Sequence, residues 1–403
     1  MNEEVARADE RWLNRGVFGI GAASLLADLG YEIPTALLPS FLTSTLGAPA
    51  AALGLIEGIA DGLGGGARLV GGGLADDPQS RRTTAVGGYT ATAVLSALIG
   101  AAGAAWQVGV LRSGAWIARG LRGPARSALL ADLAPPAAYG RAYGFERALD
   151  NLGAIGGPLL ALGLVAVFDV RIAIGLSVIP GLLAALAIVA AIRTAPRLRP
   201  REREPLRLRV GPVVSSRLGR LLAAITAFEL GNVAATLLIL RATDLLTPRH
   251  GHSSAVKLGL VLYAAFNLAA STASVPAGHA ADRRGALSVF VAGTALFLAA
   301  DVGFAVTDAG LWALAILFVL AGVAKASAET AEQTVVAAYA PEEVRGSAFG
   351  IVAAIQSFGN LAASAVAGAL WTLVSARAAF LYLAAWMLLA LAAVVWNRAR
   401  SNA

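Results

Sequence analysis

Four arginines share one face of an apolar stretch near the middle of the sequence. Residues 109–132 are apolar enough to cross a bilayer, yet they contain Arg112, Arg119, Arg122 and Arg126. At about 100° per residue, these side chains fall within a sector of roughly 80°. An arginine at the centre of a bilayer costs about 2.5 to 3.5 kcal/mol. We therefore expect the stripe to face a water-filled cavity or acidic partners rather than lipid.

Carboxylates in other apolar stretches supply possible partners. Asp28 and Glu32 are four residues apart, as are Glu57 and Asp61, so each pair lies on one face of a helix. A carboxylate in a low-dielectric cavity can bind and release a proton or hold a cationic group. The second half of the chain adds its own polar set within apolar stretches: Glu229, Asn232, Lys325, Glu329 and Glu332. Together these residues predict a site for protons or an ionic substrate inside the membrane.

The elements that carry these residues are long apolar segments. Of 403 residues, 57% are hydrophobic and 14% are charged, which is unlike a soluble domain of this size. Apolar runs of about 18 or more residues alternate with short polar or Gly/Pro segments, a pattern typical of membrane-spanning helices. The sequence predicts an all-α membrane protein with twelve spans. They are residues 15–42, 49–75, 83–103, 106–133, 142–168, 171–193, 218–246, 256–280, 286–306, 310–339, 346–374 and 377–397.

The basic residues indicate how the chain is oriented. The net charge is +7, but the arginines concentrate in every second loop, as the positive-inside rule requires, so we expect a lipid bilayer rather than nucleic acid as the partner. Both termini are then cytoplasmic, and we expect the plasma membrane of a bacterium. The first 16 residues have mixed charge and no cleavage site, which argues against a signal peptide. There is no cysteine, so disulfides and thiol chemistry are excluded.

The chain repeats internally. GGLAD at 72–76 corresponds to GHAAD at 278–282, and APPAAYGRAYG at 134–144 corresponds to APEEVRGSAFG at 340–350. Both pairs are separated by 206 residues. A Pro- and Arg-rich segment lies between the sixth and seventh spans and reads as a linker. We expect an N-terminal six-helix bundle at 1–193, a basic cytoplasmic linker at 194–217 and a C-terminal six-helix bundle at 218–403, with the site near the middle of their interface.

These repeated segments resemble the signature loops of the major facilitator superfamily. Gly72, Leu74, Ala75 and Asp76 match the G-x-x-x-D-R-x-G-R-R signature that follows the second span, but Asp77 replaces its arginine. The copy after the eighth span is closer to the pattern. The resemblance implies that this loop joins the halves in the outward-facing state, with gating residues Gly72, Asp76, Gly278, Asp282 and Arg283. The weaker first copy leaves open how strong its contact is, and a plain basic turn is the alternative.

The fifth span contains a second motif. Gly153, Gly157 and Pro158 form G-x-x-x-G-P, which resembles the signature of drug/proton antiporters of the same superfamily, although plain helix packing is an alternative. Arg112 is similarly placed to an arginine of that family, but Trp116 stands where the family has glycine. The resemblance also implies that spans one, four, seven and ten line the central cavity. These spans carry the richest charge sets, and by the repeat offset Arg119 corresponds to Lys325 and Arg126 to Glu332.

The favoured function is proton-coupled export of a small molecule or ion by alternating access. Import of an organic anion or metal chelate by proton symport is the alternative. A purely structural interpretation has Asp28 or Glu32 neutralising Arg119, with Glu57 and Asp61 bracing the interface between the halves. We expect a monomer without cofactor or metal that is not an enzyme, since no H-E-x-x-H or G-x-S-x-G motif occurs. A loop metal site at His250 and His252, a channel and a sensor are less favoured.

Overall fold

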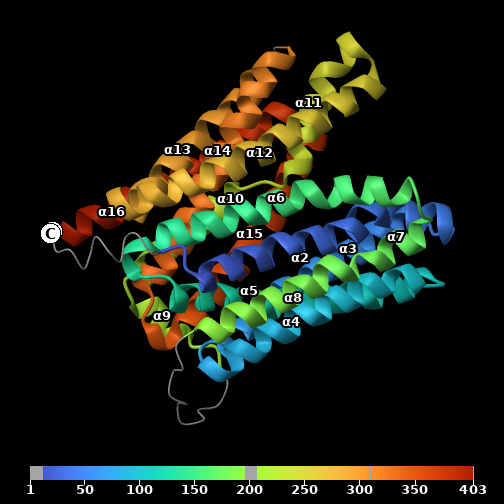
Figure 1. The fold of residues 1–403 in the computed structure, drawn as a ribbon. Helices are drawn as coiled ribbons and strands as arrows, with labels where there is room; N and C mark the ends of the chain where they lie inside the picture. Colours follow the sequence, from blue (N-terminus) through green and yellow to red (C-terminus); the bar gives the residue numbers. More distant parts are fainter. Residues whose placement is uncertain (1–11, 196–206, 309, 403) are drawn as a thin grey trace.

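The computed structural model describes residues 12–195, 207–308 and 310–402, and these form an all-helical molecule of two bundles (Figure 1). The N-terminal bundle contains α2 (Arg15–Ser40), α3 (Ala50–Ala75), α4 (Pro78–Leu98), α5 (Ala105–Leu133), α6 (Tyr139–Val165), α7 (Val170–Leu176) and α8 (Val178–Thr194). The last two form the sixth span. A short helix, α9 (Val210–Ser215), follows the part of the linker at 196–206 that lies outside the described residues.

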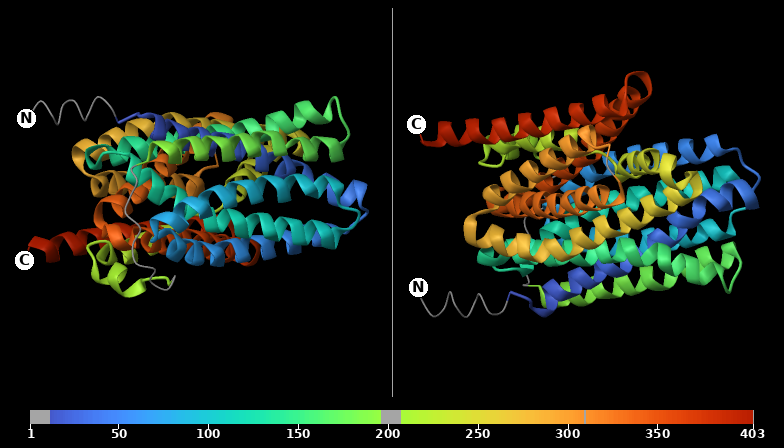
Figure 2. Two further views of the ribbon diagram at one scale, coloured as in Figure 1. Left: turned by 60° about the horizontal axis from the view of Figure 1, so that its bottom comes forward. Right: turned by 90° about the horizontal axis from the view of Figure 1, so that it is seen from above.

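The C-terminal bundle contains α10 (Gly219–Gly231), α11 (Ala235–His250), α12 (His252–Arg284), α13 (Ala286–Val306), α14 (Leu311–Tyr339), α15 (Arg345–Leu373) and α16 (Ala376–Asn402). Helices α10 and α11 form one span that is interrupted at residues 232–234. The prediction of an all-α membrane protein with two six-span bundles is thus confirmed. In Figure 2, α2 begins and α16 ends at the same end of the molecule. The predicted N-terminal tail lies mostly outside the described residues.

Ten helical segments of the described chain are long and apolar enough to cross a membrane by composition alone. Helices α3 and α5 are not among them, because their charged residues lower the hydropathy of these segments. These residues are Glu57, Asp61 and Arg68 on α3, and the arginine stripe on α5. Large apolar side chains such as Leu162, Leu186 and Ile316 are exposed on the outside of the bundles. A lipid-facing surface explains this exposure.

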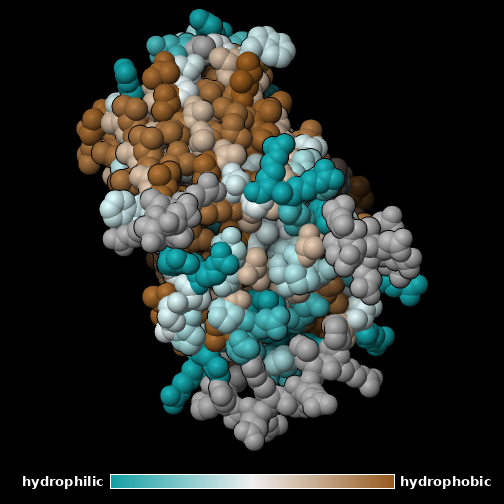
Figure 3. Space-filling model, turned by 90° about the vertical axis from the view of Figure 1, so that its left-hand side faces the viewer, coloured by the Kyte–Doolittle hydropathy of each residue, from teal (hydrophilic) through white to brown (hydrophobic). Residues whose placement is uncertain are grey.

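The two bundles meet most closely at one end, which we call the latch end. Helix α3 packs against α15 there, and α6 packs against α12. A Cβ atom built on Gly278 would lie 2.0 Å from the Gly140 carbonyl oxygen, so only glycine permits this close approach. Away from the latch end the bundles diverge (Figure 1). Seen from that end, hydrophilic residues gather beside the hydrophobic surface of the C-terminal bundle (Figure 3).

Both copies of the repeated loop join the bundles at the latch end. Asp282 accepts hydrogen bonds from the backbone N–H groups of Gly140 (2.6 Å) and Arg141 (3.1 Å), and pairs with the Arg141 guanidinium at 2.9 Å. Asp76 accepts from the backbone N–H (2.8 Å) and hydroxyl (2.5 Å) of Ser347. Each carboxylate therefore caps the first turn of a helix in the other bundle, a favourable position for an anion.

The weaker first copy of the signature nevertheless forms its contact. Asp77, which replaces the family arginine, caps α4 by accepting from the backbone N–H of Ser80 at 2.7 Å. Arg81 donates to the Ala75 carbonyl at 2.6 Å and pairs with Asp132. In the N-terminal copy, Asp77 thus caps the next helix, while Asp76 still forms the contact between the bundles.

Candidate functional site

A cavity of about 520 Å³ lies between the two bundles. Its wall is formed by α2, α3, α5 and α6 from one bundle and by α10, α14 and α15 from the other, together with the residues of the α10–α11 interruption. The charged lining is balanced, with five arginines and five carboxylates. They are Arg68, Arg119, Arg122, Arg126, Arg147, Asp28, Asp61, Asp150, Glu229 and Glu329. A cavity of this size and polarity can hold a small charged or strongly polar ligand.

Three of the four stripe arginines line this cavity, and aromatic rings hold two of them. Arg119 donates from Nη2 to the Tyr31 hydroxyl at 2.6 Å, with its guanidinium 4.3 Å from the centre of that ring. Arg122 lies 4.0 Å from the centre of the Tyr89 ring. Cation–π contacts stabilise a guanidinium without neutralising it. These arginines therefore keep their positive charge available to the cavity.

Arg112 is the exception. It is only 1% exposed and does not line the cavity; instead it pairs with Glu57 at 3.0 Å and donates to Thr35 at 3.0 Å. Its guanidinium lies 3.4 Å from the centre of the Trp116 ring. The tryptophan that replaces the family glycine thus covers Arg112. Within the described chain, Arg112 and Glu57 form a closed pair inside the N-terminal bundle.

Asp28 lies on the cavity wall, is 4% exposed, and has no hydrogen bond or ion pair with any described residue. Glu32, one turn further along α2, has none within the described chain either. Arg119 binds Tyr31 rather than either carboxylate. The static Asp28–Arg119 or Glu32–Arg119 pair is therefore not formed.

The glycines of the fifth span pack directly against these two carboxylate residues. A Cβ atom on Gly153 would lie 2.6 Å from the Asp28 Cβ, and one on Gly157 would lie 2.3 Å from the Glu32 Cβ. The G-x-x-x-G spacing on α6 thus matches the four-residue spacing of the acids on α2. Close packing of these helices is what positions Asp28 at the cavity.

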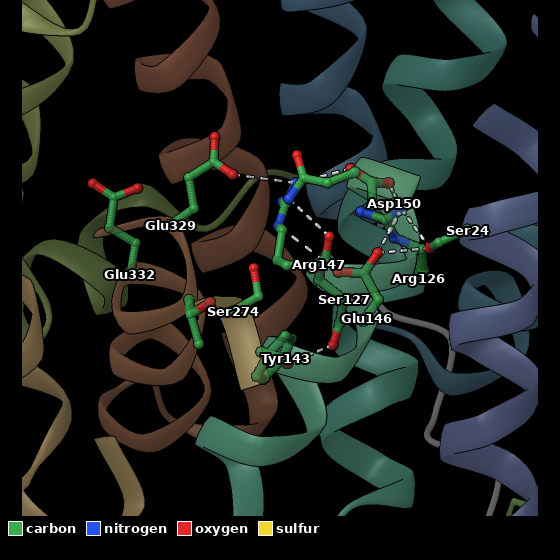
Figure 4. Close-up of polar contacts among 12 residues, drawn as sticks. Ser24, Arg126, Ser127, Tyr143, Glu146, Arg147, Asp150, Ser274, Glu329 and Glu332 are labelled. Atoms are coloured by element: carbon green, nitrogen blue, oxygen red, sulfur yellow. Dashed lines mark hydrogen bonds and ion pairs between the residues drawn. The ribbon is translucent and has the colours of Figure 1, made fainter. Parts of the chain in front are cut away.

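A charge network on α6 faces the C-terminal bundle (Figure 4). Arg126 of α5 pairs with Glu146 at 2.8 Å and with Asp150 at 3.4 Å. Arg147 pairs with Asp150 at 3.3 Å and reaches toward Glu329 of α14, at 3.9 Å. This last pair crosses between the bundles. Such a contact can form or break when the bundles move relative to each other.

The C-terminal wall is built around the interrupted span. Glu229 accepts a hydrogen bond from the Asn232 side chain at 3.0 Å. From α15, Asn360 donates to the Asn232 carbonyl at 2.7 Å, and the Ser364 hydroxyl accepts from the backbone N–H of Ala234 at 3.0 Å. These two side chains satisfy backbone groups that the interruption frees. The helix break is therefore a stabilised structure.

Of the remaining predicted residues, Asp61 lines the central cavity, whereas Glu57, Glu332 and Lys325 do not. Asp61 is on its wall, where it accepts from Trp116 Nε1 at 2.7 Å, but Glu57 is paired within the N-terminal bundle, so this acid pair does not brace the interface. Glu332 is fully buried, accepts from Gln356 at 2.8 Å, and contacts the Glu229 carboxyl. Lys325 lines a smaller cavity inside the C-terminal bundle.

Three cavity residues were not predicted from the sequence: Arg68, Arg147 and Asp150. Arg147 and Asp150 are three residues apart in a predicted span, so their spacing indicates a shared helix face as clearly as that of Asp28 and Glu32. They were overlooked because only spans one, four, seven and ten were expected to line the cavity. Arg68 donates to the Ala353 carbonyl across the interface at 3.0 Å. In the part of the chain that the structure describes, no group of three His, Asp or Glu residues could hold a metal ion.

Comparison with known proteins decides the family. The model of the Major Facilitator Superfamily matches residues 20–260 and again residues 221–403. The chain belongs to the major facilitator superfamily. It is therefore an integral membrane protein and a secondary transporter, as the resemblance implied.

Individual proteins are also similar to this chain in sequence or in fold. An uncharacterised protein of Mycobacterium tuberculosis is 33% identical over 366 residues, covering 89% of this chain and 86% of the relative. An MFS-type transporter of Methanocaldococcus jannaschii is 26% identical over 383 residues, covering 95% and 94%. The crystal structure of the human organic anion transporter MFSD10 superposes with a TM-score of 0.74 at 18% identity, covering 94% of this chain and 99% of that one. This last similarity shows a shared fold.

Proposed function

We propose that this superfamily member exports a small molecule or ion in exchange for protons. The observation that carries the proposal is Asp28, a buried carboxyl on the cavity wall with no hydrogen bond or ion pair in the described chain. A carboxyl in this position can be neutralised by a proton or by a cationic substrate, but not easily by both at once. Competition of this kind is the simplest basis for exchange.

The packing around Asp28 supports antiport. The two glycines of the antiporter-like motif contact Asp28 and Glu32 directly, so the motif and the acidic pair form one unit. Both latch contacts are formed while the bundles diverge at the other end. With both termini in the cytoplasm, as the arginine distribution predicts, this is the outward-facing state of an alternating-access cycle.

Proton-coupled import of an organic anion or metal chelate is the second candidate. Arg119, Arg122 and Arg126 line the cavity, and aromatic rings hold the first two without cancelling their charge. The structurally similar human protein is named an organic anion transporter. An anionic substrate on these arginines would move with protons rather than against them.

Proteoliposomes with an internal pH-sensitive dye distinguish the two. Divalent metals, drug cations and organic anions are added in turn, with and without a proton gradient. For export by antiport, we expect a cation to drive counter-movement of protons, and Asp28→Asn to remove this signal. Asp244→Asn, the same change at an exposed position on α11, is the matched control and should leave the signal intact.

Two outcomes would contradict the proposal. Transport of an anion with protons moving in the same direction would establish symport. Full proton counter-movement in Asp28→Asn would show that this carboxyl does not carry the exchange.

A further inference from the structure

A second cavity lies inside the C-terminal bundle, next to the interruption between α10 and α11. This side chamber has a volume of about 200 Å³ and is enclosed by α11, α12, α13, α14 and α15. It shares Asn232, Ala234, Glu329 and Asn360 with the wall of the central cavity. Pockets for drug-sized ligands measure roughly 300–1,000 Å³. The side chamber therefore suits a smaller molecule that enters from the central cavity.

Asp301 gives the side chamber an unpartnered carboxylate. It is the only charged residue of α13 and is 4% exposed. Its Oδ2 atom has no hydrogen-bond partner, and the described chain offers it no ion pair. Phe297 and Phe304, one turn away on either side, line the same wall. A buried carboxylate together with aromatic rings favours a positively charged group.

Lys325 gives the side chamber a cation. Its Nζ atom lies 5.6 Å from the centre of the Phe266 ring, and it forms no ion pair with Asp301 or with any other described residue. Glu329, one turn along α14, faces Arg147 of the other bundle instead. Lys325 thus lines the chamber without an ion pair in the described chain and is placed to bind the carboxylate of a ligand.

The interrupted helix adds both signs of partial charge to the same wall. Gly231, the last residue of α10, and Ala235, the first residue of α11, both line the side chamber. The carbonyl end of a helix favours a cation, and the N–H end favours an anion. The chamber wall therefore offers complementary partners to a positive and a negative group together.

We propose that the side chamber binds a small zwitterion, with its ammonium group at Asp301 and its carboxylate at Lys325. A lone cation would leave Lys325 unpaired, and a lone anion would leave Asp301 unpaired. Only a ligand with both charges, such as an amino acid, neutralises both side chains. This inference concerns binding, and it does not depend on the direction or the proton coupling proposed above.

The test is equilibrium binding to the purified full-length protein. Radiolabelled glycine, L-alanine and L-leucine are the probes. Ethylamine, which lacks the carboxylate, and propionate, which lacks the ammonium group, compete against L-alanine. We expect at least one amino acid to bind, and each alanine analogue to be about tenfold weaker or more than L-alanine, because each analogue loses a hydrogen bond to a charged group.

Two substitutions assign each end of the ligand. In Asp301→Asn, L-alanine should lose about tenfold in affinity and bind no better than propionate. In Lys325→Gln, it should bind no better than ethylamine. The controls Asp308→Asn and Lys257→Gln make the same changes at exposed positions of the same bundle and should bind like the wild type.

Size-exclusion chromatography establishes that each variant is folded. If Asp301→Asn does not fold, Lys325→Gln still tests the carboxylate end by itself. Failure of all three amino acids to bind the wild type would overturn the proposal. So would variants that discriminate between L-alanine and its analogues as the wild type does.

Discussion

The two bundles contain corresponding repeated loops but differ in how their intramembrane charges are paired. In the N-terminal bundle, most intramembrane cations have an acidic or aromatic partner, as with Arg112 and Glu57 or Arg126 and Glu146. In the C-terminal bundle, Lys325 contacts only the Phe266 ring and the Asp301 Oδ2 atom has no partner in the described chain, although both residues line one chamber; the first span is also interrupted. The N-terminal bundle thus holds most of its intramembrane cations in fixed contacts, whereas the C-terminal bundle keeps two charged side chains of one chamber without ion pairs in the described chain.

The largest expected effect is on transport through Arg119. Its cation is held over Tyr31 on the cavity wall, and Arg119→Leu removes this charge from the centre of the site. We expect transport to fall to background in the liposome assay while folded protein remains in the membrane. Arg171→Leu, an arginine outside the central cavity, is the comparison variant. Normal flux through Arg119→Leu would remove this residue from the site.

The next largest effect is expected on the free energy of unfolding, which should fall more for a variant in the N-terminal bundle than for one in the C-terminal bundle. Arg126→Leu leaves Glu146 without its 2.8 Å partner, and breaking a buried pair costs about 3–5 kcal/mol. Glu332→Gln in the C-terminal bundle should cost about 1 kcal/mol or less, because the amide can still meet Gln356 and Glu229. Thermal unfolding in detergent measures both. Equal losses in the two variants would refute the view that only the N-terminal bundle depends on fixed ion pairs.

The interruption between α10 and α11 can be tested through the α15 side chains that bond to its backbone. Ser364→Ala removes the hydroxyl that accepts from the Ala234 backbone, at a cost of about 1–3 kcal/mol for the unsatisfied group. We expect faster amide hydrogen exchange at residues 232–236 than in the wild type, with α2 unchanged. Thr372→Ala, an exposed hydroxyl further along α15, is the control. Unchanged exchange at the interruption would show that α15 does not hold it in place.

The smallest effect concerns pH at the latch. Burial raises the pKa of the Asp76 carboxyl, although hydrogen bonds from Ser347 oppose the shift. When the latch opens, this carboxyl returns to water and to an ordinary pKa of about 3.9. The closed latch therefore binds the proton more tightly, so acidification stabilises it, and the gain is lost as pH rises through the raised pKa.

Because the chain has no cysteine, a pair of introduced cysteines can carry spin labels that report the distance between the bundles at the latch end. We expect the closed population to grow as the pH falls toward 4, and this dependence to disappear in Asp76→Asn. A closed population that falls on acidification would contradict the sign of the effect.

Much of the fold could be predicted because the length of an apolar run is a local signal and the internal repeat can be found by comparing the sequence with itself. The arginine-bearing span was predicted at 106–133 and forms a helix at Ala105–Leu133. The seventh span was predicted at 218–246 and forms at Gly219–His250, but its interruption at residues 232–234 was not predicted. No proline marks the break at Asn232; the side chains that stabilise it, Asn360 and Ser364, lie 128 and 130 residues away. Local sequence patterns cannot reveal hydrogen bonds to residues so distant in the chain.

The site was harder to predict than the helices. The stripe on α5 was identified from its spacing, but nothing in that spacing separates Arg112, which is closed off by Glu57, from Arg119, which faces the cavity. Arg147 and Asp150 were missed because the fifth span was not expected to contribute. The position of Asp301 on a chamber wall could not be predicted, since a single acidic residue in an apolar run indicates neither its spatial neighbours nor a cavity beside it.

Glu329 belongs to the walls of both cavities and faces Arg147 across the bundles. Occupancy of the side chamber and separation of the bundles therefore act on one carboxylate. By thermodynamic reciprocity, if a chamber ligand draws Glu329 away from Arg147, opening of the bundles must tighten that ligand's binding by the same factor. Ligand binding next to the interrupted helix and separation of the bundles would then be linked by one coupling free energy.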